Sequence, residues 1–323
     1  MTGSTVALGI VGAGIMGERM LNAALNHAAD TVRVSGVWDP SASAMARVRE
    51  LFPAAPPSGS AAEVIRASDC LYIASPPATH LAHGRAALAA GKPVFCEKPL
   101  AVDVADARAF VEEAGEQGAV NFPFASSLAV EALGDWLGQG AIGRPERIRI
   151  EMGFRAWPRH FQQDAAGWLD GRREGGFTRE VGSHFLFLCR RLAGELTGLE
   201  ARVTYPSDGR SERRIEANFW AGALPVTLVG TVGETDRDEY NEWLLEGDKG
   251  ALRLRDWSIA ERRTGEGAFE TAPNALPIDE VRMLVLRRQL EGVARMTRGE
   301  PHHLATLGEA LDVQETVEAI LAS

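Results

Sequence analysis

The first part of the chain alternates short apolar runs with longer amphipathic stretches. The apolar runs predict strands at residues 6–11, 32–38, 70–74 and 93–96. The stretches between them predict helices at residues 14–27, 42–52 and 80–90. Strands that alternate with helices indicate a parallel sheet whose crossovers are right-handed. This pattern predicts an α/β domain over residues 1–122.

The pattern changes after about residue 121. A helix is predicted over residues 127–138, and after it polar and apolar residues alternate with a period of two. The alternating segments predict strands at residues 147–154, 200–205, 214–219, 226–232, 242–246 and 251–255. The run Gly247-Asp-Lys-Gly250 predicts a hairpin turn between the last two.

One-sided alternation is typical of an antiparallel sheet with one covered face and one charged face. Two C-terminal helices are predicted at residues 279–298 and 306–321. The second region is therefore predicted to be an α+β domain with an open, mainly antiparallel sheet over residues 123–323.

Length and composition agree with two globular domains. The chain has 323 residues, of which 45% are hydrophobic and 24% are charged, so it can bury a sizeable core. The net charge of −10 disfavours nucleic acid as a partner, because an acidic surface repels phosphates. No run approaches roughly 18 consecutive apolar residues, so we expect no transmembrane helix.

The cysteines and the N-terminal segment indicate a cytoplasmic protein. Residues 6–16 are apolar, but they lack a preceding basic segment and a following cleavage site, so we interpret them as a strand and not as a signal peptide. Cys70, Cys96 and Cys189 are few, odd in number and scattered. They predict free buried thiols in a reducing compartment, without disulfides and without a metal site.

A glycine motif lies where the first predicted strand ends. Gly12-Ala-Gly-Ile-Met-Gly17 has the spacing GxGxxG and lies between a strand and a helix. In a Rossmann domain, the first glycine makes the tight turn, the second admits the pyrophosphate and the third lets helix and strand pack closely. The helix N-terminus also offers unpaired N–H groups to the phosphates. The predicted cofactor-binding residues here are Gly12, Gly14, Ile15, Met16 and Gly17.

An acidic residue ends the second predicted strand. Asp39 lies where a carboxylate can accept hydrogen bonds from both hydroxyls of the adenine ribose, and it would repel the 2′-phosphate of NADP. The sequence therefore predicts NAD as the cofactor, with NADP less favoured. The plainer alternative is that residues 12–17 form only a glycine turn and that Asp39 caps a helix before Pro40.

Two further segments follow predicted strands, at the carboxyl edge where ligands bind to such sheets. The first, Ala74-Ser-Pro-Pro-Ala-Thr-His80, contains consecutive prolines that end a strand and stiffen the loop. The second is Glu97-Lys-Pro99. We expect both segments to border the cofactor, through Ser75, Pro76, Pro77, His80, Glu97 and Lys98. A purely local structural role, such as a helix cap by His80, is the alternative.

Taken together, these motifs resemble those of the Gfo/Idh/MocA family of oxidoreductases. The resemblance runs nearly end to end, and it includes Gly175-Gly176 through His184 and the C-terminal run from Glu309 to Glu318. It implies a Rossmann domain followed by an open sheet that carries the substrate pocket. It also implies a dehydrogenase or reductase of sugars, polyols or cyclitols that forms dimers or tetramers.

The resemblance also implies roles for single residues. Lys98 matches the lysine of the family's Glu-Lys-Pro motif, near nicotinamide and substrate, and His184 matches the histidine of its Asp-x-x-x-His pair. Glu180 stands where the family usually has aspartate, and Glu174 stands where a third glycine is common. Asn121 lacks the arginine that often follows it. These departures all fall on the substrate side.

Lys98, His184 and Glu180 are the predicted catalytic residues. Oxidation of a secondary alcohol releases a hydride to nicotinamide and a proton that histidine or lysine can take. Glu180 and His184 are four residues apart in a predicted helix, so they would share one face, and Glu180 would bind the substrate hydroxyl or orient His184. Alternatively, Lys98 is a surface lysine in a turn and His184 is a histidine of a core helix.

A region rich in arginine and aromatic residues follows the first strand of the second domain. Arg155, Trp157 and Trp168 could line a polar pocket. By resemblance, Trp168 lies against the nicotinamide ribose. The alternative is that the tryptophans pack in the core and that Arg155 faces solvent.

Three functions are open on sequence alone. The leading one is an NAD(H)-dependent dehydrogenase that acts on the CH–OH groups of a sugar, polyol or cyclitol. The second keeps the fold but acts on a non-carbohydrate carbonyl, imine or dihydrodiol, for which Glu180 leaves room. The third is a non-catalytic sensor that binds dinucleotide and a partner protein. Lys98 and His184 argue against the sensor, because a sensor needs no groups for proton transfer.

The expected partners follow from the same features. We expect a sugar-like small-molecule substrate and no nucleic acid or membrane. An open sheet face invites self-association, so a homodimer or homotetramer is also expected.

Overall fold

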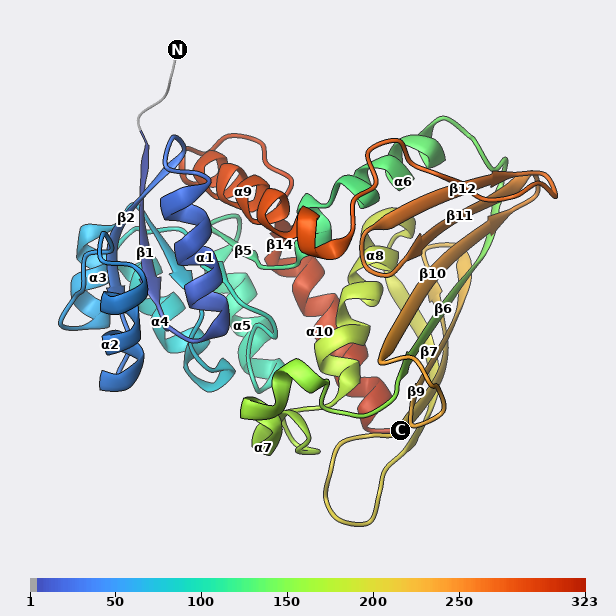
Figure 1. Ribbon diagram of the computed structural model, residues 1–323, viewed down its shortest axis with the longest axis horizontal. Helices are drawn as coiled ribbons and strands as arrows, with labels where there is room; N and C mark the ends of the chain where they lie inside the picture. The colour runs from blue at the N-terminus through green and yellow to red at the C-terminus, as the bar shows by residue number, and fades with distance from the viewer. Residues whose placement is uncertain (1–4) are drawn as a thin grey trace. The chain divides into compact units, whose positions relative to one another are not determined.

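A computed structural model describes residues 5–323, which divide into two compact units (Figure 1). Unit 1 comprises the chain up to Ser126 together with Arg282–Leu311, and unit 2 comprises Ser127–Val281 and Asp312–Ser323. The chain passes from unit 1 to unit 2 after Ser126, close to the domain boundary predicted after residue 122. The return of Arg282–Leu311 to unit 1 is not predicted, because a helical pattern does not specify which sheet the helix will cover.

Unit 1 is built on a six-stranded sheet in the order β14-β5-β4-β3-β1-β2. β1 to β4 run parallel to one another, as predicted; β5, which was not predicted, continues the parallel order, and β14 joins β5 in the antiparallel direction. The strands are β1 (Val6–Val11), β2 (Val32–Trp38), β3 (Cys70–Ile73), β4 (Val94–Cys96), β5 (Gly118–Val120) and β14 (Ala305–Thr306). All residues of β1, β3 and β4 are buried, so these strands appear in the sequence as continuous apolar runs.

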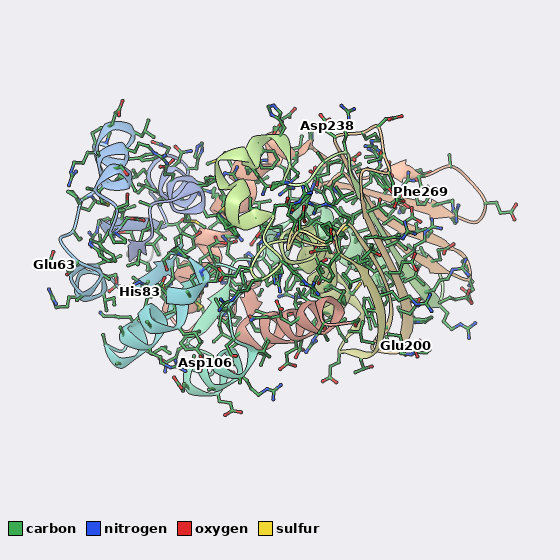
Figure 2. All side chains as sticks on the ribbon, turned by 90° about the horizontal axis from the view of Figure 1, so that it is seen from below. Glu63, His83, Asp106, Glu200, Asp238 and Phe269 are labelled. Atoms are coloured by element: carbon green, nitrogen blue, oxygen red, sulfur yellow. The ribbon has the colours of Figure 1, made fainter. Side chains whose placement is uncertain are left out.

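Helices of unit 1 pack on this sheet. They are α1 (Ile15–Asn26), α2 (Ala42–Leu51), α3 (Ala61–Ala67), α4 (Pro77–Ala89), α5 (Val104–Ala114) and the greater part of α9 (Ile278–Thr297). One buried cluster joins Leu8 and Ile10 of β1 to Met20 of α1 and Leu290 of α9. In Figure 2, Glu63, His83 and Asp106 mark α3, α4 and α5.

Unit 2 is built on an eight-stranded sheet in the order β13-β12-β11-β10-β6-β9-β8-β7. Neighbouring strands are antiparallel except for the parallel pair β6 and β9, so the predicted mainly antiparallel sheet is confirmed. The strands are β6 (Pro145–Phe154), β7 (Leu196–Thr204), β8 (Arg214–Ala221), β9 (Leu224–Val232), β10 (Glu239–Gly247), β11 (Gly250–Arg255), β12 (Ile259–Thr264) and β13 (Glu270–Thr271).

The predicted hairpin is also confirmed, because Gly247 pairs with Gly250 at the end of β10 and β11. Two strands, β12 and β13, have no counterpart among the predicted elements. Glu200 on β7 and Phe269 next to β13, both labelled in Figure 2, belong to opposite edges of the sheet.

One face of the second sheet is apolar and covered. In β6, Ile148, Ile150 and Met152 are buried, whereas Arg149 between them is exposed. The helices of unit 2 are α6 (Leu128–Gly138), α7 (Ala166–Leu169), α8 (Ser183–Ala193) and the part of α10 (Leu307–Leu321) from Asp312 onward. Shorter helical turns lie at Pro123–Ser126 in unit 1 and at His160–Ala165 and Thr178–Gly182 in unit 2.

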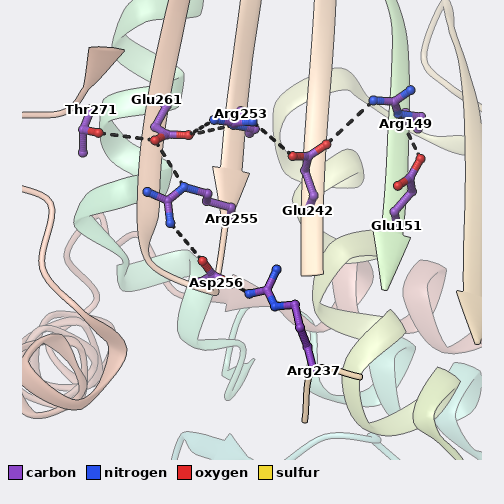
Figure 3. A network of polar contacts seen from close by, with 9 residues as sticks. All are labelled: Arg149, Glu151, Arg237, Glu242, Arg253, Arg255, Asp256, Glu261 and Thr271. Atoms are coloured by element: carbon purple, nitrogen blue, oxygen red, sulfur yellow. Dashed lines mark hydrogen bonds and ion pairs between the residues drawn. The ribbon is translucent and has the colours of Figure 1, made fainter. Parts of the chain in front are cut away.

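The opposite face of the sheet carries a row of ion pairs (Figure 3). Glu242 of β10 contacts Arg149 of β6 at 3.8 Å and Arg253 of β11 at 3.4 Å. Glu261 of β12 then pairs with Arg253 at 2.6 Å and with Arg255 at 3.2 Å. The predicted charged face is therefore observed, and its charges alternate in sign from strand to strand.

Within residues 5–323, no helix combines the length and the apolar character that crossing a bilayer requires.

Candidate active site

The carboxyl edge of the first sheet gathers most of the predicted cofactor-binding residues. Gly12 follows β1, Asp39 follows β2, Ser75 follows β3, and Glu97 and Lys98 follow β4. Because these strands are parallel, their carboxyl ends share one edge of the sheet. The N–H groups of Gly12 and Glu97 extend the ladder to this edge, through hydrogen bonds of 2.9 Å to the carbonyl oxygens of Trp38 and Ile73.

The glycine motif forms a turn that side chains would block at two positions and leave unaffected at a third. Gly12 has φ of +99°, and a Cβ there would lie 2.4 Å from the backbone of Ala74 and Ser75. A Cβ on Gly17 would lie 2.1 Å from the carbonyl oxygen of Gly12. A Cβ on Gly14 would meet no atom within 4 Å. The open space at Gly14, directly before the first turn of α1, fits the pyrophosphate of a dinucleotide.

Asp39 is held beside this turn by its backbone neighbours. Its Oδ2 accepts a hydrogen bond of 2.8 Å from the N–H of Ala13, and its Oδ1 accepts one of 2.8 Å from the N–H of Ser41. The N-cap of α2 is Ser41, whose Oγ accepts from the N–H of Ala44, so Asp39 is not the cap of that helix. Each carboxylate oxygen keeps a second lone pair for a ribose hydroxyl.

His80 connects the two loops that follow β3 and β4. Its side chain is buried, with Nε2 2.7 Å from the carbonyl oxygen of Ser75 and Nδ1 2.9 Å from that of Pro99. α4 begins three residues earlier, with Pro77 in its first turn, so His80 is not the cap of this helix. Burial lowers the pKa of His80, and the two carbonyl oxygens act in the opposite direction. His80 thus holds Ser75 and Pro99, which flank the predicted cofactor edge.

Glu97 lies in a buried polar network. Its Oε1 accepts hydrogen bonds from the hydroxyl of Tyr72 and, at 2.6 Å, from Nδ2 of Asn121. Nε2 of Gln289, on α9, donates to Oδ1 of Asn121. Burial and the nearby carboxylate raise the pKa of Tyr72 well above its ordinary value. This network fixes the backbone next to Lys98, which is half-buried and joined to Pro99 by a cis peptide bond.

Sequence reasoning did not identify Tyr72 or Gln289 as parts of this site. Asn121 had one local signal, a polar side chain directly after a short apolar strand. No local sequence signal identifies Gln289, because its partner Asn121 is 168 residues away in the chain.

Glu180 and His184 lie in unit 2, in two consecutive helical segments. Glu180 belongs to a π-helical turn, Thr178–Gly182, and His184 lies in the first turn of α8, Ser183–Ala193. The prediction that both residues lie in a helix is confirmed, but the helix begins with a π turn that the sequence pattern did not predict. A π turn has more residues per turn than an α-helix, so spacing by four does not place the two side chains as in an α-helix, and such turns are frequent at functional sites.

A buried carboxylate anchors the start of the π turn. Oε1 of Glu212 accepts hydrogen bonds of 2.7 Å from both the N–H and the hydroxyl of Thr178. Gly176 has φ of +103°, and a Cβ there would lie 2.2 Å from Oε2 of Glu212. Glycine is required at 176 both by the backbone conformation and by the approach of this carboxylate.

An ion pair between Arg179, in the π turn, and Glu318, on α10, also anchors this turn. Arg179 donates to both oxygens of Glu318 at 2.7 Å, and also to the carbonyl oxygen of Gly175 at 2.8 Å. Glu180 directly follows these two anchored residues, Thr178 and Arg179, and its own side chain is partly exposed.

The tryptophans predicted near the substrate have different environments. Trp157 is buried, and its indole N–H donates to the carbonyl oxygen of Leu169, so it packs in the core. Arg155 faces solvent and pairs with Asp238. Trp168 is 50% exposed on α7, and its contact with the nicotinamide ribose stays a prediction. The ring of Trp257, which sequence reasoning did not single out, lies 5.5 Å from that of His184.

The three cysteines are free and buried, as predicted. Burial raises the pKa of the Cys70 and Cys189 thiols to about 12. Among the side chains that the structure describes, no group of three or more His, Cys, Asp or Glu residues is arranged to hold a metal ion.

Comparison with known proteins agrees with this architecture. A family model described as the Gfo/Idh/MocA oxidoreductase family, NAD-binding Rossmann fold, matches residues 6–124. An inositol 2-dehydrogenase of Cereibacter sphaeroides is 43% identical over 35% of this chain and 34% of that enzyme. A D-apiose dehydrogenase of Paraburkholderia graminis is 29% identical over 72% of this chain and 64% of that enzyme. These matches span less than two thirds of either relative.

Among solved structures, an oxidoreductase from Agrobacterium radiobacter in complex with NAD⁺, L-tartaric acid and magnesium has the same fold. The two chains superimpose with a TM-score of 0.82 at 19% identity, over 99% of this chain and 97% of the other. The fold, the glycine turn with Asp39, and the family match over residues 6–124 agree with one another. Residues 6–124 therefore match the NAD-binding Rossmann domain of the Gfo/Idh/MocA oxidoreductase family.

Proposed function

We propose that this protein is an NAD(H)-dependent oxidoreductase that interconverts a secondary alcohol and a ketone on a sugar, polyol or cyclitol. The observation that carries the proposal is the glycine turn, with open space at Gly14 and with Asp39 fixed beside it by the N–H of Ala13. The names of the inositol and apiose dehydrogenases support the substrate class.

The chain's own residues would bind the cofactor in a defined way. The N–H groups of Ile15, Met16 and Gly17, in the first turn of α1, would face the pyrophosphate. Asp39 would accept hydrogen bonds from the ribose hydroxyls, and its charge would disfavour a 2′-phosphate, so NAD would bind more tightly than NADP. Ser75, Pro76 and Pro77 would border the same edge, held by the contact of His80 with the carbonyl oxygen of Ser75.

Lys98 and His184 would share the proton transfer. When bound, NAD⁺ accepts a hydride, with its electron pair, from the alcohol carbon. The hydroxyl proton must then pass to a base of the protein, and the neutral form of His184 or of Lys98 can take it. Lys98 would also polarise the reacting oxygen. Glu180 would accept a hydrogen bond from a substrate hydroxyl or orient His184, and it reaches further than the aspartate usual in the family.

The proposal is tested by replacing Lys98 with methionine, which is unbranched like lysine and one atom shorter, and which removes the amine. We expect kcat to fall by about 10²–10⁴-fold, the usual contribution of a positioned proton-transfer group. NADH affinity should stay within about twofold. The assay measures NAD⁺ reduction with inositols and sugars, and NADH oxidation with keto-sugars.

Lys92→Met, in the loop before β4, is the matched control and should turn over like the wild type. Full turnover by Lys98→Met would remove Lys98 from the mechanism. A wild type that binds NADH tightly but turns over no substrate of the panel would instead favour a dinucleotide-binding sensor.

We also propose a homodimer or homotetramer formed through the charged face of the second sheet. On that face Arg149, Glu242 and Arg253 alternate in sign, so a second copy can place opposite charges against them (Figure 3). Light scattering on purified protein should give at least twice the mass of the chain, and raising the salt concentration should weaken the association. A monomer at all salt concentrations would exclude this interface.

The cytoplasm is the proposed location. Three buried cysteines without a disulfide support a reducing compartment.

A further inference from the structure

A tryptophan occupies a turn whose backbone favours glycine. β11 and β12 pair up to Arg255 and Ile259, and residues 256–258 connect them. Asp256 has φ of +49° and Trp257 has φ of +70°. These two are the non-glycine residues of the described chain with positive φ. Non-glycine residues rarely adopt a positive φ, and bulky residues do so least often. Residues strained in this way cluster at functional sites.

Strand β10 holds this turn in place. The N–H of Trp257 donates to Oδ1 of Asn241 at 3.0 Å, and the N–H of Asp256 donates to the carbonyl oxygen of Asn241 at 3.1 Å. The indole N–H of Trp257 donates to Oε1 of Glu239 at 2.8 Å. Both the backbone and the ring of Trp257 are therefore fixed by β10.

The ring fixed in this way packs on the helix that carries His184. The indole lies 5.5 Å from the His184 ring at an interplanar angle of 78°, which is an edge-to-face contact. It also lies 5.5 Å from the ring of Phe185 at 40°. The contact with Phe185 can be explained by packing of the ring against α8. The contact with His184 restricts the plane of a predicted catalytic imidazole.

Glu239, the anchor of the indole, is itself held by a cation. Nη1 of Arg159 lies 3.3 Å from Oε2 of Glu239. The guanidinium of Arg159 lies 4.8 Å from the ring of Phe161, which is 64% exposed. A connected series of side chains thus runs from Arg159 through Glu239 and Trp257 to His184, entirely within unit 2.

We propose that Trp257 is a positioning residue that sets the orientation of the His184 imidazole, and that Glu239 keeps the indole in place. A histidine that moves a proton must present one ring nitrogen to the substrate hydroxyl, and rotation of the ring takes that nitrogen away. The turn serves this purpose despite its positive φ, because the hydrogen bonds of Trp257 to Asn241 and Glu239 hold the indole in one position. The inference rests on the proposed role of His184 in proton transfer.

The test compares variants of the ring and of its anchor. Trp257→Ala removes the edge-to-face contact, Trp257→Phe keeps an aromatic ring without the N–H, and Glu239→Ala removes the anchor. Glu239→Gln keeps an oxygen that can accept the indole N–H. Asp256→Gly is the control, because it relieves the positive φ at 256 and removes the ion pairs of Asp256 with Arg237 and Arg255 without changing the indole or the His184 ring.

Two measurements are made on each variant: the NMR signals of the His184 imidazole, assigned with a His184→Gln variant, and the pH profiles of kcat and of kcat/KM. Trp257→Ala and Glu239→Ala should shift the His184 signals and lower kcat by up to about a hundredfold, the loss that a small misplacement can cause. Their pH profiles should also change, whereas NADH affinity stays within about twofold. Trp257→Phe and Glu239→Gln should retain more activity, and Asp256→Gly should match the wild type.

Unchanged His184 signals in Trp257→Ala and Glu239→Ala would overturn the proposal. Shifted signals with unchanged kcat and pH profiles would also overturn it, because Trp257 would then serve packing alone. If Trp257→Ala folds poorly, Glu239→Ala keeps the test decisive, because it removes the anchor and leaves the indole in the chain. A wild type without turnover on any substrate, whose His184 signals still depend on Trp257, would support the packing contact and contradict the proposed function.

Discussion

At the scale of single residues, the glycines of the cofactor turn differ in what a methyl group would meet. Gly12 and Gly17 face backbone atoms at 2.4 Å and 2.1 Å, so they are required for folding of the turn. Gly14 faces open space, so no neighbouring atom of the described protein requires glycine at this position. The second glycine of the motif is therefore explained by a ligand, whereas the first and third are explained by packing.

Gly14→Ala should fold normally and bind NADH poorly. The substitution adds a methyl group at the N-cap of α1, which should cost less than about 1 kcal/mol of stability. The same methyl group should lower NADH affinity at least about tenfold, or ~1.4 kcal/mol, by occupying the place of the pyrophosphate. Gly12→Ala should instead lower the free energy of unfolding by about 1–3 kcal/mol, because of its positive φ. Unchanged NADH affinity in Gly14→Ala would contradict the proposed cofactor position.

The buried thiols predict how stability depends on pH. The pKa of Cys70 and Cys189 is raised to about 12 by burial, whereas unfolded thiols titrate near ~8.5. Between these values the unfolded chain binds fewer protons than the folded one, so the free energy of unfolding falls as the pH rises. By pH 10 the loss should reach about 1–2 kcal/mol per thiol.

Urea denaturation between pH 7 and pH 10, under reducing conditions, measures this dependence. A thiol reagent at pH 8 should also label the folded protein far more slowly than the unfolded one. A free energy of unfolding that stays level up to pH 10, or rapid labelling of the folded protein, would show that the thiols are not buried as described.

At the scale of elements, the segment from Thr178 to His184 is where local pattern and structure disagree. The sequence there predicts a helix, which is confirmed, but it does not predict the π turn at the start of that helix. The structure has a π-helical turn before α8, anchored by Glu212 at its start and by the Arg179–Glu318 pair on its side. Glu212 and Glu318 are distant in sequence from the turn, so a window of neighbouring residues contains no information about them.

Glu212→Ala should therefore destabilise unit 2 and disturb the turn that carries Glu180. The variant leaves the N–H and hydroxyl of Thr178 without their acceptor, and Thr178 is fully buried. An unsatisfied buried donor should cost about 1–3 kcal/mol in the free energy of unfolding, measured by urea denaturation. Glu216→Ala, at a half-buried position of β8 where the carboxylate pairs with Arg214, is the control and should stay within about 1 kcal/mol of the wild type.

An equal effect of both substitutions would mean that Glu212 does not anchor the turn.

The elements that the sequence predicts well are those that local contacts determine. The glycine motif with its strand and helix lies within residues 6–26, and the Gly247–Gly250 hairpin pairs neighbours in sequence. β5 and β14 have three and two residues, too short for a periodic pattern, and they form because they pair with each other across the chain. The same limit applies to side chains, since the Glu97 network and the turn at Trp257 bring distant residues together.

At the scale of the whole molecule, the chain leaves unit 1 after Ser126 and returns to it from Arg282 to Leu311. Leu286, Leu290 and Val293 of α9 belong to the buried cluster of the first sheet. Gln289 also completes the network around Asn121 and Glu97. The sequence predicts a single boundary after residue 122. That boundary assigns α9 to the second domain, whereas α9 completes the core of the first sheet.

A fragment of residues 1–126 should fold poorly, because it exposes the apolar surface that α9 covers. The same fragment fused through a flexible linker to residues 282–311 should recover a cooperative thermal transition and bind NADH. Circular dichroism and calorimetry on both fragments measure this difference. If residues 1–126 alone melt cooperatively at the temperature of the fusion and bind NADH equally well, α9 is not part of this unit's core.

The central claim is that the turn at Gly12 receives the pyrophosphate of a dinucleotide and that Asp39 binds its adenine ribose. Isothermal titration calorimetry of the pure, folded wild type with NADH and then with NADPH tests both parts directly. We expect saturable binding of NADH and binding of NADPH that is weaker by at least about tenfold, or ~1.4 kcal/mol. Preference for NADPH would contradict the role of Asp39, and no heat of binding from either nucleotide at millimolar concentration would contradict the claim as a whole.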